Sequence, residues 1–248
     1  MDKPRVAFFS FSSCEGCQLE VLNLEDRLLN LVNVVDIVNF REAMSERSTN
    51  YDVAFVEGSI TSPAEIPQLN KIRQQAKVLV TMGACAHLGG INCLKNHFRV
   101  EISQKLVYGD KWHYFPSTVA QPLEVVVKVD YFIPGCPVDK EEFLRVVKGI
   151  LWGQKPFIPD YPVCVECKLR GNVCIFFKGM PCAGPVIRAG CNARCPSYGN
   201  SCIGCRGLVS EPNITSWREM MGERGFSNKQ ADDLLEMFNS YWEVLAGE

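Results

Sequence analysis

The sequence predicts an α/β protein in which a parallel sheet is followed by a short irregular segment and by C-terminal helices. Strand and helix signals alternate over the first ~155 residues, which is typical of a parallel sheet covered on both faces. The stretch from Cys164 to Cys205 then holds eight of the 13 cysteines and fits neither a helix period nor a strand period. We therefore expect three parts, at residues 1–155, 156–212 and 213–248.

Apolar runs predict five strands in the first part, at residues 6–11, 34–40, 53–56, 77–82 and 129–133. Helical spacing of apolar residues predicts helices at 18–32, 63–76, 139–152, 217–224 and 229–245. The stretch from 85 to 128 is less regular, and we expect short helices and loops there. Five strands joined in this way fit a flavodoxin-like order.

Local signals mark the start of two of these helices. Ser62 followed by Pro63 predicts an N-cap and a first helical residue, and Glu65 stands where a capping box needs it. Ser227 or Asn228 is the predicted N-cap of the last helix. We expect the two C-terminal helices to pack on the body of the protein or on a partner.

The bulk composition narrows the function class. The chain is 47% hydrophobic and 22% charged with a formal net charge of -2, which indicates neither nucleic acid nor an anionic membrane as partner. No apolar run reaches the roughly 18–20 residues of a transmembrane segment, and the N-terminus shows no secretion signal. We therefore expect a cytoplasmic protein, in which dense cysteine indicates metal binding or catalysis rather than disulfides.

The cysteine-rich stretch predicts metal sites made only of sulfur. Its eight cysteines could supply two complete four-thiolate sites, and no histidine lies among them. Soft thiolate ligands select zinc, copper(I) or iron–sulfur clusters. Bound metal would also stabilise the fold of this segment, which shows no pattern of regular secondary structure.

A third four-sulfur site follows from the predicted topology. Cys14 and Cys17 come after the first strand, Cys85 after the fourth and Cys136 after the fifth. The loops after parallel strands meet at the carboxyl edge of the sheet, where open α/β folds bind their ligands. Glu57 closes the third strand at the same edge.

Zinc and iron–sulfur clusters are both compatible with these cysteines. Zinc favours paired C-x-x-C motifs in structural sites. Proline directly after a ligand, as in Cys136-Pro137 and Cys195-Pro196, is instead typical of ferredoxin-type cluster motifs. We favour clusters, and three of them in so small a chain predict an electron relay. A zinc-stabilised, non-redox assembly module is the alternative from another class.

The combined motifs resemble a known family. CEGC at 14–17, GACA at 83–86 and GCP at 135–137, followed by the cysteine-rich stretch, are similar to the small subunit of [NiFe]-hydrogenases. Within it the chain is most similar to the cytoplasmic group with the sulfhydrogenase delta chain and the methyl-viologen-reducing and coenzyme-coupled enzymes. The resemblance spans residues 5–207.

The resemblance implies a flavodoxin-like domain with a proximal [4Fe-4S] cluster, followed by a domain with medial and distal clusters. It implies no catalytic residue in this chain, which would not be active alone. Its partners would be a large subunit that holds the nickel–iron centre and a further flavin- or iron–sulfur-containing redox subunit. H2 oxidation or proton reduction would take place in the large subunit.

The resemblance also implies the ligand sets. The proximal ligands would be Cys14, Cys17, Cys85 and Cys136; the distal ligands Cys164, Cys167, Cys174 and Cys182; and the medial ligands Cys191, Cys195, Cys202 and Cys205. Cys164 stands where periplasmic relatives use a histidine, and Cys191 supplies a fourth medial ligand where they often have a three-iron cluster. Both departures imply three [4Fe-4S] clusters, and we expect lower potentials than in the periplasmic chain, which suits coupling to NAD(P) or ferredoxin.

A complex-I-like iron–sulfur subunit is the redox alternative, although that relative carries adjacent cysteines in place of CEGC and lacks the cysteine-rich stretch. Several other residues have weaker signals. Glu15 and Glu57 are candidates for a proton route, and Arg194 and Arg206 for tuning the medial site by charge. We expect the three histidines and the last cysteine to be surface, polar or packed residues rather than ligands: His87, His97, His113 and Cys93.

Overall fold

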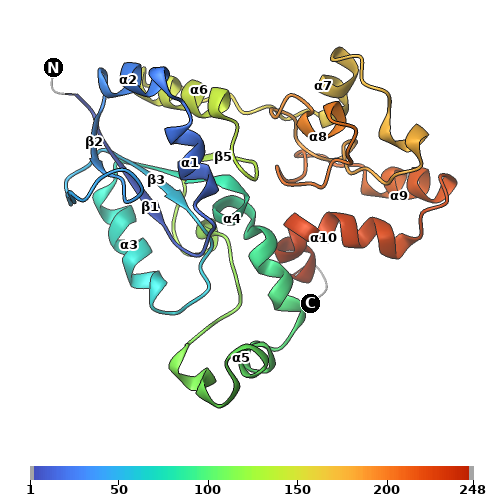
Figure 1. The fold of residues 1–248 in the computed structure, drawn as a ribbon, viewed down its shortest axis with the longest axis horizontal. Helices are drawn as coiled ribbons and strands as arrows, with labels where there is room; N and C mark the ends of the chain where they lie inside the picture. The colour runs from blue at the N-terminus through green and yellow to red at the C-terminus, as the bar shows by residue number, and fades with distance from the viewer. Residues whose placement is uncertain (1–2, 246–248) are drawn as a thin grey trace.

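The computed structural model describes residues 3–245 and contains a five-stranded, fully parallel sheet (Figure 1). The strands lie in the order β2-β1-β3-β4-β5, the flavodoxin-like order that the sequence predicts. Their bounds are β1 Arg5–Ser10, β2 Asp36–Asn39, β3 Val53–Glu57, β4 Val78–Met82 and β5 Tyr131–Ile133. All five predicted strands are thus present, and β2 and β5 are shorter than expected.

The sheet is covered on both faces because its strands alternate apolar side chains between two cores. Phe8 and Phe55 enter one core, which α6 (Lys140–Leu151) closes with Phe143. The neighbouring side chains Ala54 and Val56 enter the other core, on the side of α3 (Glu65–Gln75). Figure 1 shows the two layers on either side of the sheet.

The single helix predicted at 18–32 is wrong. The chain forms two helices, α1 Gly16–Leu22 and α2 Asp26–Val32, separated by a turn in which Glu25 has φ 53°. The turn reorients the chain so that Leu24 and Leu31 enter the same core. Apolar spacing alone does not detect such a break, because the residues on both sides keep the helical period.

The predicted start of α3 is also wrong. Ser62 and Pro63 lie in the turn before the helix, which begins at Glu65. Half of the predicted capping box is present, since the Glu65 carboxylate accepts the backbone N–H of Ser62 at 2.9 Å and that of Thr61 at 2.7 Å. The carboxylate thus caps the turn instead of the helix.

Between β4 and β5 the chain forms short helices, as predicted. They are α4 Gly83–Leu88, η1 Gly90–His97, α5 Val100–Tyr108, η2 Gly109–Tyr114 and η3 Leu123–Val125. α5 and η2 form an arm that projects from the body in Figure 1. Tyr108 and Phe115 stack at 4.2 Å within this arm.

The cysteine-rich stretch folds around a second hydrophobic core. It contains the short helices α7 Val163–Leu169, η4 Ile175–Lys178 and α8 Arg194–Ser197, and the rest is irregular, as expected. Two C-terminal helices, α9 Ile214–Glu223 and α10 Asn228–Leu245, complete this core with residues such as Trp217 and Leu235.

The last helix connects the core of the cysteine-rich stretch to the sheet part. Ser227 is its N-cap, because its hydroxyl accepts the N–H of Gln230 while its own N–H donates to the Gln230 side chain at 2.9 Å. Phe238 of α10 packs against Ala84 and Leu88 of α4, in the sheet part. The C-terminal helices therefore pack on the body, and the boundaries at 155 and 212 stay a prediction. Within residues 3–245, no helix combines the length and apolarity needed to cross a membrane.

Candidate metal centres

The carboxyl edge of the sheet brings together the four cysteines of the predicted proximal set, Cys14, Cys17, Cys85 and Cys136. Cys17 is buried in α1 and Cys85 is half-buried in α4, whereas Cys14 and Cys136 reach the surface. Burial raises the pKa of the Cys85 thiol to about 12, and charge on Cys136, on Glu57 and on Cys14 raises it further. Partial burial also raises the pKa of the Cys136 thiol, and charge on Cys14 and on Glu57 raises it further.

These effects test whether the four thiols suit a metal group. Each thiol with a raised pKa in this set is affected by another member, which places the four in one electrostatic neighbourhood. Buried thiols in such surroundings hold their protons and are inert, and a coordinated metal is what deprotonates them. The four sulfurs form a soft donor set, which fits zinc, copper(I) or an iron–sulfur cluster.

Glu57 shapes this edge through the backbone. Its carboxylate is 2% exposed and accepts the N–H groups of Cys17 and Gln18, both at 3.1 Å. Burial raises the pKa of Glu57, while these two hydrogen bonds oppose the rise. The side chain thus holds the first turn of α1 in place, a structural role that the sequence did not identify.

Gly83 is required where α4 meets α1. It has φ +89°, and a Cβ atom built there would lie 2.4 Å from the Sγ of Cys17. Only glycine permits both this backbone conformation and this close approach.

The second set begins on α7. Cys164 and Cys167 lie on that helix, Cys174 precedes η4, and Cys182 is buried behind them. Burial raises the pKa of Cys164 to about 12, and charges on the other three cysteines add to the rise. Trp217 of α9 donates its indole N–H to the Cys182 carbonyl at 2.9 Å, which ties this set to the second core.

The third set surrounds α8 and the end of the stretch. Burial raises the pKa of Cys205 to about 12, with added effects from Cys191 and Cys195. Burial likewise raises the pKa of Cys202 well above its usual value, with Cys205 and Cys191 among the causes. Charge on Cys182 also raises the pKa of Cys202, so the second and third sets lie close to each other.

Two links join neighbouring sets. The backbone N–H of Cys136 lies beside the Cys205 thiol and lowers its pKa, so the third set meets the set at the sheet edge. The Sγ of Cys182 accepts the backbone N–H of Cys202 at 3.4 Å, so the third set also meets the second. The third set therefore lies between the other two.

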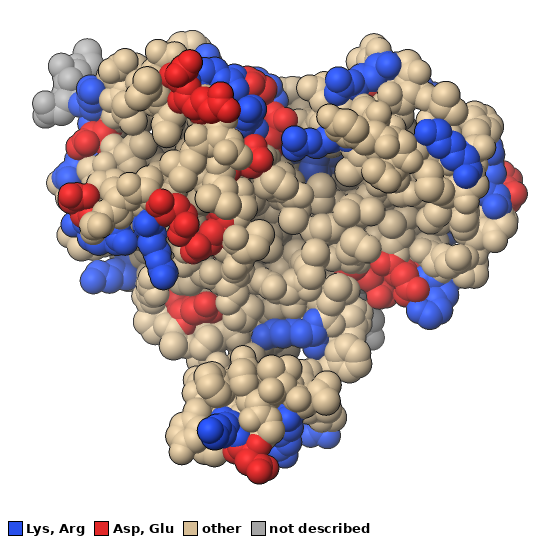
Figure 2. Space-filling view, viewed as in Figure 1, with Lys and Arg blue, Asp and Glu red and all other residues tan. Residues whose placement is uncertain are grey.

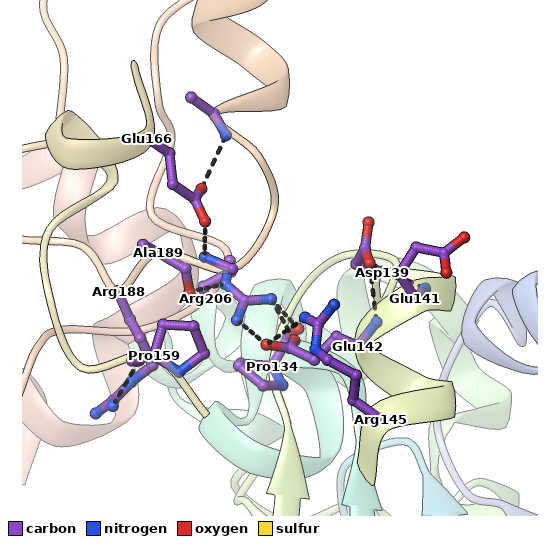
Figure 3. A network of polar contacts seen from close by, with 12 residues as sticks. Pro134, Asp139, Glu141, Glu142, Arg145, Pro159, Glu166, Arg188, Ala189 and Arg206 are labelled. Carbon is purple, nitrogen blue, oxygen red and sulfur yellow. Dashed lines mark hydrogen bonds and ion pairs between the residues drawn. The ribbon is translucent and has the colours of Figure 1, made fainter. Parts of the chain in front are cut away.

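A buried polar network connects the sheet part with the cysteine-rich part (Figure 3). Arg206 binds Glu142 of α6 through two hydrogen bonds of 2.8 Å each. Nearby, Glu166 of α7 accepts the backbone N–H of Gly190 at 2.8 Å and of Ala193 at 3.0 Å, on either side of Cys191. The sequence did not single out Glu142 or Glu166, although Glu166 lies between two cysteines in CVEC as Glu15 does in CEGC.

The two arginines that flank predicted ligands differ. Arg206 is buried, and its charge lowers the pKa of Cys191 against the effect of burial. Arg194 is exposed and contributes its backbone N–H to the Cys191 thiol. Of the two side chains, that of Arg206 is the one placed beside the third set.

The remaining candidates take ordinary structural places. Cys93 is fully buried and its thiol contacts the Ala120 carbonyl at 3.2 Å, as expected of a packed thiol. His87 stacks on Phe132 at 4.1 Å, and burial lowers its pKa to about 4. Glu15 accepts the Ser10 hydroxyl at 2.6 Å, and this bond lowers its pKa.

The other two histidines lie apart from the cysteine sets. His97 stands 3.6 Å from a Glu236 carboxylate oxygen, and His113 is exposed on the arm next to Tyr114. Neither position suits a ligand of the three sets.

Comparison with known proteins agrees with this arrangement. The family described as NADH ubiquinone oxidoreductase, 20 Kd subunit, matches residues 14–150. Sulfhydrogenase 2 subunit delta of Pyrococcus furiosus is 37% identical over 221 residues, which cover 88% of this chain and 92% of that protein. The chain belongs to the family of [NiFe]-hydrogenase small subunits and 20 kDa subunits.

Other members extend the likeness beyond the sheet. A subunit of the F420-non-reducing hydrogenase of Methanococcus voltae is 31% identical over 241 residues, covering 85% of this chain and 84% of that one. A chain of the NAD+-reducing [NiFe]-hydrogenase in its H2-reduced state superposes with a TM-score of 0.57 at 29% identity, over 64% of this chain and 96% of that chain.

This family member is therefore a hydrogenase-associated electron-transfer subunit of the iron–sulfur type, and an oxidoreductase component. The 20 Kd subunit match ends at residue 150, before the cysteine-rich stretch begins. The hydrogenase relatives continue across that stretch, so they account for more of the chain than the complex-I-like alternative does.

Proposed function

We propose that this chain is the electron-transfer small subunit of a heteromeric cytoplasmic [NiFe]-hydrogenase. It relays electrons between the nickel–iron centre of a separate large subunit, where H2 is oxidised or protons are reduced, and a further flavin- or iron–sulfur-containing redox subunit. The chain is not active alone. The cytoplasm suits its 13 cysteines, since thiols stay reduced there.

We assign three [4Fe-4S] clusters to the three cysteine sets. The proximal ligands are Cys14, Cys17, Cys85 and Cys136; the medial ligands Cys191, Cys195, Cys202 and Cys205; and the distal ligands Cys164, Cys167, Cys174 and Cys182. When bound, such a cluster supplies a group that takes up and releases one electron. We favour clusters over the zinc alternative because proline directly follows Cys136 and Cys195, as in ferredoxin-type cluster motifs.

The observation that carries this proposal is the order of the sets. Cys136 and Cys205 connect the proximal set to the medial set, and Cys202 and Cys182 connect the medial set to the distal set. A relay needs its centres in a row, and these two contacts support that order. Each set contains one buried cysteine: Cys17 in the proximal, Cys202 in the medial and Cys182 in the distal set.

Individual residues keep each set in shape. Glu57 holds the turn that carries Cys17, and Glu166 holds the loop that carries Cys191. Cys164 gives the distal set a fourth thiol, so that all three sets are of the same kind. Hydrogen bonds to sulfur and the local charge then set the potentials, which we expect to be low enough for NAD(P) or ferredoxin.

The surface around the proximal set suits a large partner. Cys14 and Cys136 are exposed, so this set is the one that reaches the surface at the sheet edge. Figure 2 shows charged side chains mainly towards the rim of this face, while the middle of the face, between the sheet part and the cysteine-rich part, is largely uncharged. Depletion of charge is typical of the centre of a protein interface.

Metal analysis with EPR on anaerobically purified protein tests the proposal. We expect about twelve irons per chain, reducible cubane signals and a co-purifying larger chain that contains nickel. A brown colour would accompany them. Two or three zincs per chain, no iron and no larger partner would instead indicate a structural zinc module.

A further inference from the structure

The joint between the sheet part and the cysteine-rich part contains a fully buried ion pair. Arg206 is 1% exposed and Glu142 is 0% exposed. The Nη1 atom of Arg206 donates to Oε2 of Glu142 and its Nη2 atom donates to Oε1, both at 2.8 Å. Figure 3 shows the guanidinium facing this carboxylate from the opposite side of the joint.

The same guanidinium is bound to the loops of two cysteine sets. Its Nη1 atom donates to the Pro134 carbonyl at 2.8 Å, two residues before Cys136. Its Nε atom donates to the Ala189 carbonyl at 2.8 Å, two residues before Cys191. Since Arg206 directly follows Cys205, one side chain connects the neighbourhoods of three cysteines.

Gly190 shows independently how closely the parts meet. It has φ +116°, and a Cβ atom there would lie 2.1 Å from Nη2 of Arg206 and 2.6 Å from Oε1 of Glu142. The backbone of the Cys191 loop therefore passes directly against the ion pair. A side chain at this position would push the two parts of the joint apart.

Stability alone does not explain such a pair. A buried ion pair is costly to desolvate, and apolar residues of similar volume often stabilise a protein as well or better. The charged pair adds geometric specificity, because a guanidinium group can bind a carboxylate and two carbonyls at the same time in only a few orientations.

We propose that Arg206 is a positioning residue which, with Glu142, fixes the Cys136 loop relative to the Cys191 and Cys205 loops. The pair thereby sets the spacing between the proximal and medial sets. We call this attachment of the three loops the clamp. Its consequence for electron transfer rests on the proposed function, whereas the clamp itself does not.

Hydrogen exchange of the complete, anaerobically purified protein tests the clamp. The double variant Arg206→Met with Glu142→Leu removes both charges without leaving either one unpaired. We expect amide protection at residues 135–138 and 188–192 to fall by about tenfold or more, which corresponds to about 1.4 kcal/mol of easier local opening. Protection in β3 should stay as in the wild type.

Arg73→Met is the matched control. Arg73 binds Asp130 at 2.5 Å and the carbonyls of Lys128, Ala76 and Lys77, all within the sheet part. Its removal breaks a comparable set of bonds without touching the joint. Protection at residues 135–138 and 188–192 should therefore stay unchanged in this variant.

EPR of the reduced protein tests the spacing. In the double variant we expect unchanged iron content but a weaker spin–spin interaction between the proximal and medial clusters. Arg206→Lys keeps the charge but not the fork, and we expect it to lie between the wild type and the double variant in both measurements.

Unchanged protection and unchanged spin–spin interaction in the double variant would overturn the proposal. If the double variant does not fold, Arg206→Lys decides, and wild-type behaviour in both measurements would overturn the proposal as well. If the wild type holds no iron, the proposed function is wrong, and loss of loop protection would still support the clamp.

Discussion

Gly83→Ala is the substitution that best tests the geometry of the proximal set. An L-residue at φ +89° costs about 1–3 kcal/mol in backbone strain. The new methyl group would also lie 2.4 Å from the Sγ of Cys17, and overpacking of this kind costs about 1–3 kcal/mol. We expect a total destabilisation of about 2–6 kcal/mol.

Gly109→Ala is the control for the backbone term. Gly109 has φ +54°, and nothing lies within 4 Å of a Cβ atom built there. Both substitutions reduce the freedom of the unfolded chain equally, so this effect cancels in the comparison. The difference of about 1–3 kcal/mol between them belongs to the contact with Cys17 and corresponds to about 2–12 °C in the midpoint of thermal unfolding.

Thermal unfolding and iron content of both variants form the assay. Gly83→Ala should unfold at the lower temperature and lose about four of about twelve irons, because Cys17 is displaced. Gly109→Ala should retain all of its iron. Equal midpoints together with equal iron content would refute the close approach of Gly83 to Cys17.

Three further outcomes follow from the structure. Cys191→Ser should lose about one cluster, and it should slow electron flow to the external acceptor more than hydrogen–deuterium exchange at the nickel site. The control variant Cys93→Ser should keep its iron. Equal loss of both activities in an assembled complex would contradict the order of the relay. Trp217→Phe leaves a buried carbonyl without its indole donor and should destabilise the protein by about 1–3 kcal/mol in urea unfolding, whereas the exposed Trp152→Phe should change little. His87 has a pKa lowered from 6.5 to about 4, so the unfolded chain binds more protons between these values and stability falls as pH drops through that window; His87→Gln should remove part of this loss in acid-unfolding curves.

The sequence predicts the sheet well because its signals are local. Buried runs such as residues 53–56 are apolar throughout, and loops that follow such runs carry the cysteines. The parallel topology then brings Cys14, Cys85 and Cys136 to one edge, since the carboxyl ends of all parallel strands meet there. This part of the candidate site could be predicted without coordinates.

The errors arise where tertiary packing decides the local structure. The break between α1 and α2 is set by the need to bury both Leu24 and Leu31, and no turn residue such as glycine or proline marks it. Glu65 satisfies the motif of a capping box and yet binds the turn before the helix. In both places the sequence pattern is present, but it is compatible with more than one local structure.

The joint between the two parts could not be predicted for a different reason. Glu142 is one of two adjacent glutamates near the start of an amphipathic helix, where an acidic residue is ordinary. Its partner Arg206 lies 64 residues away, and no local pattern connects them. Only the docking of the cysteine-rich part buries both side chains and makes them a pair.

The Arg206–Glu142 pair lies at the boundary between the part that the 20 Kd subunit family matches and the part beyond it. The 20 Kd subunit family covers the sheet part through residue 150, whereas the second core and the eight further cysteines lie beyond it. Arg206 and Gly190 come from the part beyond the match, and Glu142 and Pro134 come from the matched part. The ion pair therefore lies between the loops of Cys136 and Cys205, where the relay would have to be aligned. The fixed geometry of the guanidinium–carboxylate pair, and not apolar burial alone, orients the two parts there.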